Sequence, residues 1–240
     1  MESKGLFARI VNSRTKDKII IDNMDIWVRV VVRPLSFLVT YPLMRLKMTA
    51  NQASFISIFI SLVGLMMVVV GKKDGVLPAI LVFNFWIVFD AVDGNIARTN
   101  GTSSKVGTFI DAISGYLYLV VLYIALGLAV YYISDSLEYW SVVVGFITSL
   151  MTVFPRLVLQ KKNVMFGSDD DDVSSKTSYG WTKMVALNIA GPAGLMNPMM
   201  IVAFFTNLLP LYLIFYATIQ GVLGMITVAT VFKKVLNHAE

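Results

Sequence analysis

The chain contains no cysteine and a single histidine among 240 residues, and only 15% of its residues are charged. Without cysteine it has no disulfide, no zinc–thiolate centre and no thiol nucleophile. The shortage of charge accompanies 57% hydrophobic residues and a mean hydropathy of +0.73, a composition far from that of a soluble globular domain. These features predict an integral membrane protein.

Long apolar runs account for this composition. At about 1.5 Å per residue, an apolar helix of about 20 residues crosses the hydrocarbon core of a bilayer. Six runs reach or approach this length, at residues 53–70, 77–97, 107–133, 139–159, 193–209 and 211–232. Pro192, Pro198 and Pro210 interrupt the last two, so one long kinked helix at 193–232 would leave five crossings. The prediction is an all-α, polytopic membrane protein with six transmembrane helices.

The distribution of basic residues favours six crossings. If both termini are cytoplasmic, all of the 20 Lys and Arg residues except Lys72 and Lys73 lie on the cytoplasmic side, in keeping with the positive-inside rule. This topology and anionic lipid headgroups explain the net charge of +5 better than nucleic acid, for which the sequence has no motif. We therefore expect a multi-pass protein with both termini cytoplasmic and no nucleic-acid partner.

Residues 27–47 form an amphipathic segment that is not counted as a crossing. Its polar and apolar side chains take opposite helical faces: Arg29, Arg33 and Thr40 against Val31, Leu35 and Leu38. The segment predicts an interfacial helix, which either shapes the entrance to a site at that depth or is a simple anchor. The chain is accordingly divided into a cytoplasmic N-terminal segment, residues 1–50, and a transmembrane domain, residues 51–240.

Three carboxylates lie near the end of an apolar run, where charges are rare. Asp90 and Asp93 lie near the end of the second run, and Asp111 lies near the start of the third. Each carboxylate at the centre of a membrane helix costs roughly 2.5–3.5 kcal/mol on an insertion scale, so three of them require water or a cation to offset the cost. Because hard oxygen ligands suit Mg²⁺, Mn²⁺ or Ca²⁺, the three aspartates are predicted to bind metal.

Small residues and an arginine accompany these acids. The full constellation is Asp90, Asp93, Gly94, Ala97, Arg98, Gly107 and Asp111. The first two acids share one helical face with Gly94 and Ala97, which leave room for a flat base and a diphosphate that Arg98 can neutralise. Close helix packing would explain the glycines alone, but it does not explain their combination with three acids and an arginine.

Read as DxxDGxxAR, eight residues and GxxxD, this constellation resembles the signature of the CDP-alcohol phosphotransferases, a family of integral membrane enzymes. Thr49-Ala50-Asn51 is similar to the Thr-Pro-Asn that commonly precedes the first crossing there, and the predicted helix layout is similar too. The resemblance implies transfer of a substituted phosphate from a CDP-linked donor to an alcohol, with release of CMP, at the cytoplasmic face.

The same resemblance implies a role for each residue of the signature. Asp90, Asp93 and Asp111 would bind Mg²⁺ or Mn²⁺, and the CDP pocket would be lined by Gly94, Ala97, Arg98 and Gly107. It also implies a homodimer. The acceptor, a lipid or a small alcohol or anion, stays open, as does the product: a phospholipid, as in phospholipid biosynthesis, a small soluble ester or a glycan component.

One position departs from the family pattern. The fourth aspartate of the signature falls at Gly115, so the carboxylate thought to deprotonate the acceptor hydroxyl is missing. General-base help is worth about 10² to 10⁴ in rate. Either the acceptor is already an oxyanion, such as a carboxylate or phosphate, or another residue or a metal-bound hydroxide supplies the base, or the protein binds a CDP compound without turning it over.

Other polar residues within the apolar runs have simpler interpretations. Arg156, at the inner end of the fourth run, either binds a phosphate or anchors the helix at the interface. Asn84, Asn197 and Gln220 are expected to make interhelical hydrogen bonds. A transporter is the alternative of another class, but transporters usually carry polar groups near mid-bilayer and have related halves, neither of which the sequence shows.

Overall fold

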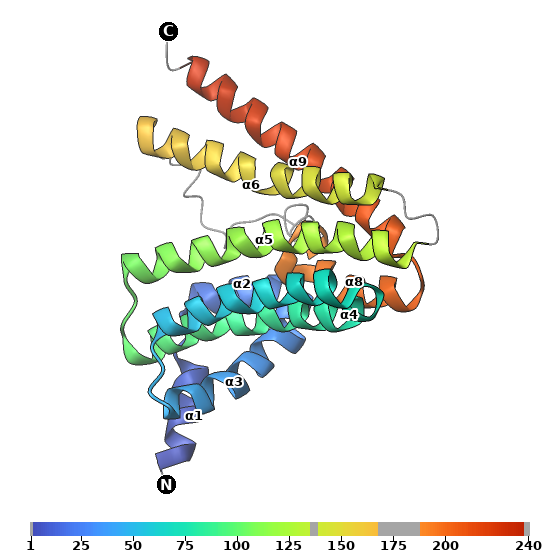
Figure 1. Cartoon of the computed structure of the whole chain (residues 1–240). Helices are drawn as coiled ribbons and strands as arrows, with labels where there is room; N and C mark the ends of the chain where they lie inside the picture. Colours follow the sequence, from blue (N-terminus) through green and yellow to red (C-terminus); the bar gives the residue numbers. More distant parts are fainter. Residues whose placement is uncertain (1, 135–138, 168–187, 238–240) are drawn as a thin grey trace.

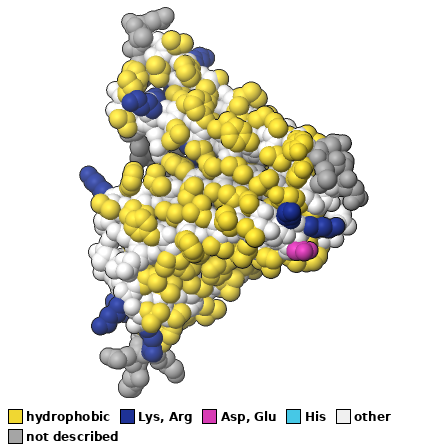
Figure 2. Space-filling model, viewed as in Figure 1, with side chains coloured by type: hydrophobic (Ala, Val, Ile, Leu, Met, Phe, Trp, Pro, Cys, Tyr) yellow, Lys and Arg dark blue, Asp and Glu magenta, His cyan; other side chains and the backbone are white. Residues whose placement is uncertain are grey.

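The computed structural model describes residues 2–134, 139–167 and 188–237, and these residues form helices and no strand (Figure 1). Four of the helices are long and apolar enough to cross a membrane: α4 (Ala50–Asn100), α5 (Lys105–Ile133), α6 (Trp140–Phe166) and α9 (Leu209–Asn237). The shorter elements are α1 (Glu2–Asn12), α2 (Lys16–Met24), η1 (Val28–Val32), α3 (Arg33–Arg45), η4 (Pro192–Met196) and α8 (Asn197–Phe205). Figure 2 shows a broad apolar surface over the long helices, with basic side chains at its margins. The predicted all-α class of membrane protein is confirmed.

The helix α4 is folded back on itself (Figure 1). Lys72 has non-helical backbone angles, φ 48° and ψ −127°. A Cβ atom added to Gly64 would lie 2.8 Å from the ring of Phe83, although the two residues would be about 28 Å apart in a straight helix. Gly75 allows this reversal, because a Cβ there would lie 1.8 Å from the carbonyl oxygen of Met67. We call the parts before and after Lys72 the first and second legs of α4; they correspond to the first two predicted runs.

A second reversal separates α8 from α9. Asn207, between them, has a φ of 58°. The hydroxyl of Tyr212 in α9 then donates a hydrogen bond of 2.7 Å to the carbonyl of Met196, the last residue of η4, directly before α8. The two segments are therefore separate helices, and the alternative of one long kinked helix is wrong. Because α8 alone is shorter than the hydrocarbon core, the number of crossings stays a prediction.

The N-terminal helices pack onto this bundle, with α3 against α4. Arg33 and Thr40 of α3 are buried together with Phe37, whereas Leu35 and Leu38 are exposed. Arg29, placed on the polar face by its spacing, is exposed; it lies in the π-helical turn η1, where the spacing of an α-helix does not hold. The buried side of α3 is therefore mixed, and the amphipathic interfacial helix stays a prediction.

Polar groups connect the long helices. Tyr118 of α5 is fully buried, stacks on Trp86 with ring centroids 3.8 Å apart, and donates a hydrogen bond of 2.9 Å to the side chain of Asn197. Asn84 donates to the carbonyl of Asn197 at 3.1 Å. Gln220 of α9 donates at 3.0 Å to a carbonyl in the helical turn that precedes η4. The interhelical hydrogen bonds expected of these amides are therefore confirmed.

Backbone contact joins α5 to α6. A Cβ atom on Gly127 would lie 2.6 Å from the carbonyl oxygen of Ser141, and one on Gly145 would lie 2.5 Å from that of Tyr123. Such close approach requires small residues at the crossing, as is common between membrane helices. These two glycines therefore set the distance between α5 and α6.

Candidate active site

Helix caps bring the motif segments to one end of the bundle. Thr49 caps α4 in a capping box with Gln52: its side chain accepts from the Gln52 backbone at 3.3 Å, and its backbone donates to the Gln52 side chain at 2.9 Å. Gly101, with a left-handed φ of 66°, ends the second leg. Ser104 caps α5 by accepting from the backbone N–H of Gly107 at 3.0 Å. The start of the first leg, the end of the second leg and the start of α5 therefore meet.

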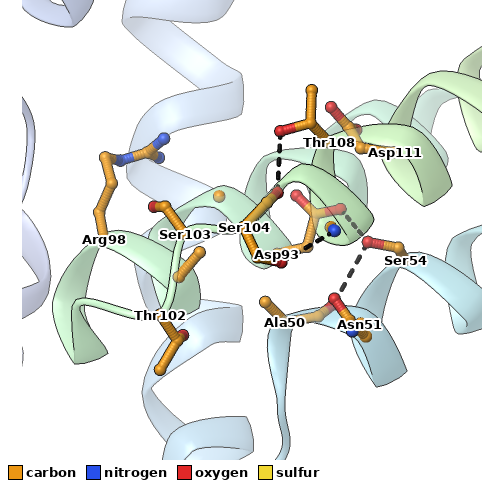
Figure 3. Close-up of a pocket in the computed structure, with 13 residues that line it drawn as sticks. Ala50, Asn51, Ser54, Asp93, Arg98, Thr102, Ser103, Ser104, Thr108 and Asp111 are labelled. Carbon is orange, nitrogen blue, oxygen red and sulfur yellow. Dashed lines mark hydrogen bonds between the residues drawn. The ribbon is translucent and has the colours of Figure 1, made fainter.

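A cavity of about 190 Å³ lies where they meet, and we call it the small cavity (Figure 3). Six motif residues line it: Asp93, Gly94, Ala97, Arg98, Gly107 and Asp111. The first leg adds Ala50, Asn51 and Ser54, and hydroxyls come from Thr102, Ser103, Ser104 and Thr108. Because the first turn of α5 also borders it, the small cavity combines small side chains, hydroxyls and a helix N-terminus, a setting suited to phosphate groups.

A cavity of about 400 Å³, the large cavity, adjoins the small one. Asp90, Asp93 and Asp111 all line it. The two cavities share Asp93, Gly94, Arg98 and Asp111. The three aspartates that the sequence singles out as metal ligands thus face one common space, although they come from two different helices.

Asp93 is fixed by the first leg of α4. The hydroxyl of Ser54 donates to Asp93 Oδ2 at 2.5 Å, and Figure 3 shows the two side chains facing each other. Asp93 is only 8% exposed. One turn further along, Ser57 and Ser114 share a hydrogen bond of 2.7 Å that ties the first leg to α5. Sequence reasoning missed these serines; their recurrence every three to four residues, continued by Ser61, was the available signal.

The guanidinium of Arg98 is held by Asn95 of the second leg, which in turn is hydrogen-bonded to α3. A Cβ on Gly94 would lie 2.9 Å from Arg98 Nη1, so glycine at this position leaves room for the arginine. Arg98 Nη2 donates to Asn95 Oδ1 at 3.0 Å, and Asn95 Nδ2 lies 3.1 Å from the hydroxyls of Ser36 and Thr40. Arg98 Nε is buried and has no hydrogen-bond partner among the described residues. It therefore remains available to a phosphate oxygen.

The donor atoms of the site suit a hard cation. No three Asp, Glu, His or Cys side chains in the described part of the chain form a compact metal-binding cluster, so the carboxylates share a cavity without a closed coordination sphere. The lining residues of both cavities supply carboxylate, hydroxyl and amide oxygens, and they include neither imidazole nor thiol. This donor set fits Mg²⁺ or Mn²⁺ and not a soft metal.

Two singled-out positions lie apart from the cavities. Gly115 is one turn beyond Asp111, and a Cβ there would have no atom within 4 Å. Arg156 is exposed on α6 and belongs to the lining of neither cavity. The structure therefore gathers the seven motif residues and leaves Arg156 away from them; its phosphate-binding role stays a prediction.

The sequence of the chain matches a known protein family. The sequence profile of the CDP-alcohol phosphatidyltransferase family matches residues 47–233, which contain the whole motif and most of the four long helices. The match does not include α1, α2, η1 or α3. Comparison with curated proteins gives no match. The chain belongs to the CDP-alcohol phosphatidyltransferase family.

Proposed function

We propose that the protein transfers a substituted phosphate group from a CDP-linked donor to an acceptor, with release of CMP, in a metal-dependent reaction. Family membership implies CDP-alcohol phosphotransfer. The observation that carries the finer proposal is the common cavity of Asp90, Asp93 and Asp111, at one end of the helices and not at their middle. A transporter would instead distribute its polar groups near mid-bilayer.

The three aspartates are assigned to the metal. Asp90, Asp93 and Asp111 would hold Mg²⁺ or Mn²⁺, and Ser54 would keep Asp93 in one orientation. When bound, the cation would offset negative charge on the diphosphate and on the departing CMP. The remaining catalytic contribution of the chain is to hold the donor in place and to exclude water from it.

The small cavity is assigned to the CDP group. Gly94, Ala97 and Gly107 leave its walls flat, and the N-terminal turn of α5 offers backbone N–H groups to phosphate oxygens. Arg98 borders both cavities, so its guanidinium can bind the diphosphate where donor and acceptor meet.

We also propose six crossings with both termini cytoplasmic, α3 in the membrane interface, and a homodimer. The two antiparallel legs of α4 and the separate helices α8 and α9 support the count. The gathering of Lys and Arg in the N-terminal segment and in the loop before α5 supports the orientation. The dimer follows from the family resemblance.

The test is the release of CMP by the purified full-length chain, in Mg²⁺, from a panel of CDP-linked donors. We expect Asp93→Asn to lose activity by at least about 100-fold, because it removes a charge from the metal site. The matched control is Asp74→Asn, an exposed acid at the opposite end of the second leg of α4, which should retain activity. A chain that neither releases CMP nor gains thermal stability from CDP with Mg²⁺ would contradict the proposal.

A non-catalytic CDP-binding role is the second candidate, and Gly115 is the observation that favours it. Because a Cβ at this position meets no atom within 4 Å, Gly115→Asp should fold normally. If only the base is missing, this variant should release CMP with neutral alcohols about 10² to 10⁴ times faster than the natural chain. No gain with any alcohol would argue against a simple missing base.

A further inference from the structure

The N-terminal segment places basic side chains in the large cavity, although it lies outside the residues that the family profile matches. Lys18 of α2 and Arg33 of α3 line this cavity together with the three motif aspartates. The family match begins only at residue 47. The charged groups that line the large cavity are Lys18, Asp22, Asp25, Arg33, Asp90, Asp93, Arg98 and Asp111.

A buried carboxylate holds these basic side chains together. Asp22 is 2% exposed and lies 2.8 Å from Arg33 Nε, 3.3 Å from Lys18 Nζ and 3.6 Å from Arg14 Nη1. Three cations therefore surround one anion, although Arg14 does not line the cavity. Asp25 is a second anion on this side, and its carboxylate accepts a hydrogen bond of 3.2 Å from the backbone of Val28. The five groups together carry one net positive charge.

This group retains a hydrogen-bond donor that no described residue uses. Arg33 is 7% exposed, and its Nη1 has no hydrogen-bond partner among the described residues. A buried guanidinium with an unused donor is costly unless a ligand completes it. Burial is also the main cause that lowers the pKa of Lys18, followed by the charge of Arg33 and opposed by Asp22. An anion between these two side chains would relieve both effects.

We propose that Lys18 and Arg33 form a subsite for an anionic oxygen group of the acceptor, a phosphate or a carboxylate, in the same cavity as Asp90, Asp93 and Asp111. The inference rests on the proposed function and adds to it the chemical class of the acceptor. The residues assigned to the donor all lie within residues 47–233, whereas this subsite lies before them. Donor chemistry and acceptor selection thus occupy different parts of the chain.

The binding test uses small probes of one carbon skeleton. Thermal unfolding of the full chain is measured with Mg²⁺ and CDP present, so that the nucleotide site is filled, and glycerol, glycerate, glycerol 3-phosphate or inorganic phosphate is added. We expect the anions, and not glycerol, to raise the melting temperature. Lys18→Gln should weaken anion binding at least about 10-fold, the scale of one lost hydrogen bond between charged groups.

Exposed lysine and arginine residues on the same segment provide matched controls. Lys16→Gln on α2 and Arg29→Gln on η1 remove a positive charge without touching the cavity, so they should bind anions as the natural chain does. If Arg33→Gln fails to fold because Asp22 loses its closest partner, Arg33→Lys keeps the charge and removes the planar fork; anion binding should then fall with CDP binding unchanged.

The outcomes separate this inference from the proposed function. CMP release that is equally fast with glycerol and glycerol 3-phosphate would overturn the anionic acceptor and leave the transferase intact. An unchanged anion response in Lys18→Gln and Arg33→Lys would also overturn it. An anion response that Lys18→Gln abolishes, in a chain that releases no CMP from any donor, would support the subsite and refute the transferase.

Discussion

Replacing Ser54 by alanine tests whether the first leg of α4 is part of the metal site. The serine hydroxyl donates to Asp93 Oδ2 at 2.5 Å and is 2% exposed, so water does not replace it. A hydrogen bond to a charged group contributes about 1.5–3 kcal/mol, or about 10- to 150-fold in an equilibrium constant. Loss of a partner that orients a metal ligand typically costs 10- to 100-fold in metal affinity. We therefore expect Ser54→Ala to require about 10 to 100 times more Mg²⁺.

The assay is CMP release as a function of Mg²⁺ concentration, with the Mg²⁺-dependent rise in melting temperature at fixed CDP as a readout independent of turnover. Ser61→Ala is the matched control, because Ser61 is equally buried on the same leg but donates at 2.7 Å only to the carbonyl of Ile58 in its own helix. Its Mg²⁺ requirement should stay within about two-fold of the natural one. Equal Mg²⁺ curves for the two variants would refute the role of Ser54.

Three further predictions concern packing, pH and metal. Gly127→Ala should lower the free energy of unfolding by about 1–3 kcal/mol, because its Cβ would lie 2.6 Å from a carbonyl oxygen of α6. Gly221→Ala is the control and should leave the stability unchanged, because a Cβ there has open space; thermal melting compares the two variants. Burial and the charge of Arg33 lower the pKa of Lys18, and Asp22 opposes them. Anion binding should therefore be complete at low pH and be lost as the pH rises, at a pH below the ordinary lysine pKa of about 10.4. Lys18→Arg should move this loss to higher pH, and a pH titration of glycerol 3-phosphate binding measures it. Chelation with EDTA should abolish CMP release and the stabilisation by CDP, and Mg²⁺ or Mn²⁺ should restore both; persistence of either after chelation would contradict a metal-dependent site.

Much of the helical framework follows from local sequence. The apolar runs are expected to be helical because only a helix satisfies its backbone hydrogen bonds in lipid within a single segment. Lys72 and Lys73 interrupt them, and the chain reverses at Lys72. The spacing of Asp90 and Asp93 puts both on one helical face, and a short loop returns Asp111 to them, so their common cavity agrees with the pattern.

The contributions missed by sequence reasoning come from residues far away along the chain. Ser54 resembles any small polar residue in a membrane helix until the fold at Lys72 brings it to Asp93. Lys18 lies in the short helix α2, and no local sequence pattern shows that this helix borders the cavity of the three aspartates. Prolines correctly marked the interruption before α9, but hydropathy does not distinguish a kink from a complete reversal, which depends on tertiary contacts such as that of Tyr212 with Met196.

The hairpin of α4 places its turn and its chemistry at opposite ends. Ser54 and Asp93 face each other about 27–32 Å from Lys72, if each leg rises 1.5 Å per residue. Gly75 allows the turn to close against Met67. A bulkier side chain at Gly75 would push the two legs apart at the turn, because even a Cβ there would lie 1.8 Å from the carbonyl oxygen of Met67. Gly75 thus holds together two legs whose far ends carry Ser54 and Asp93.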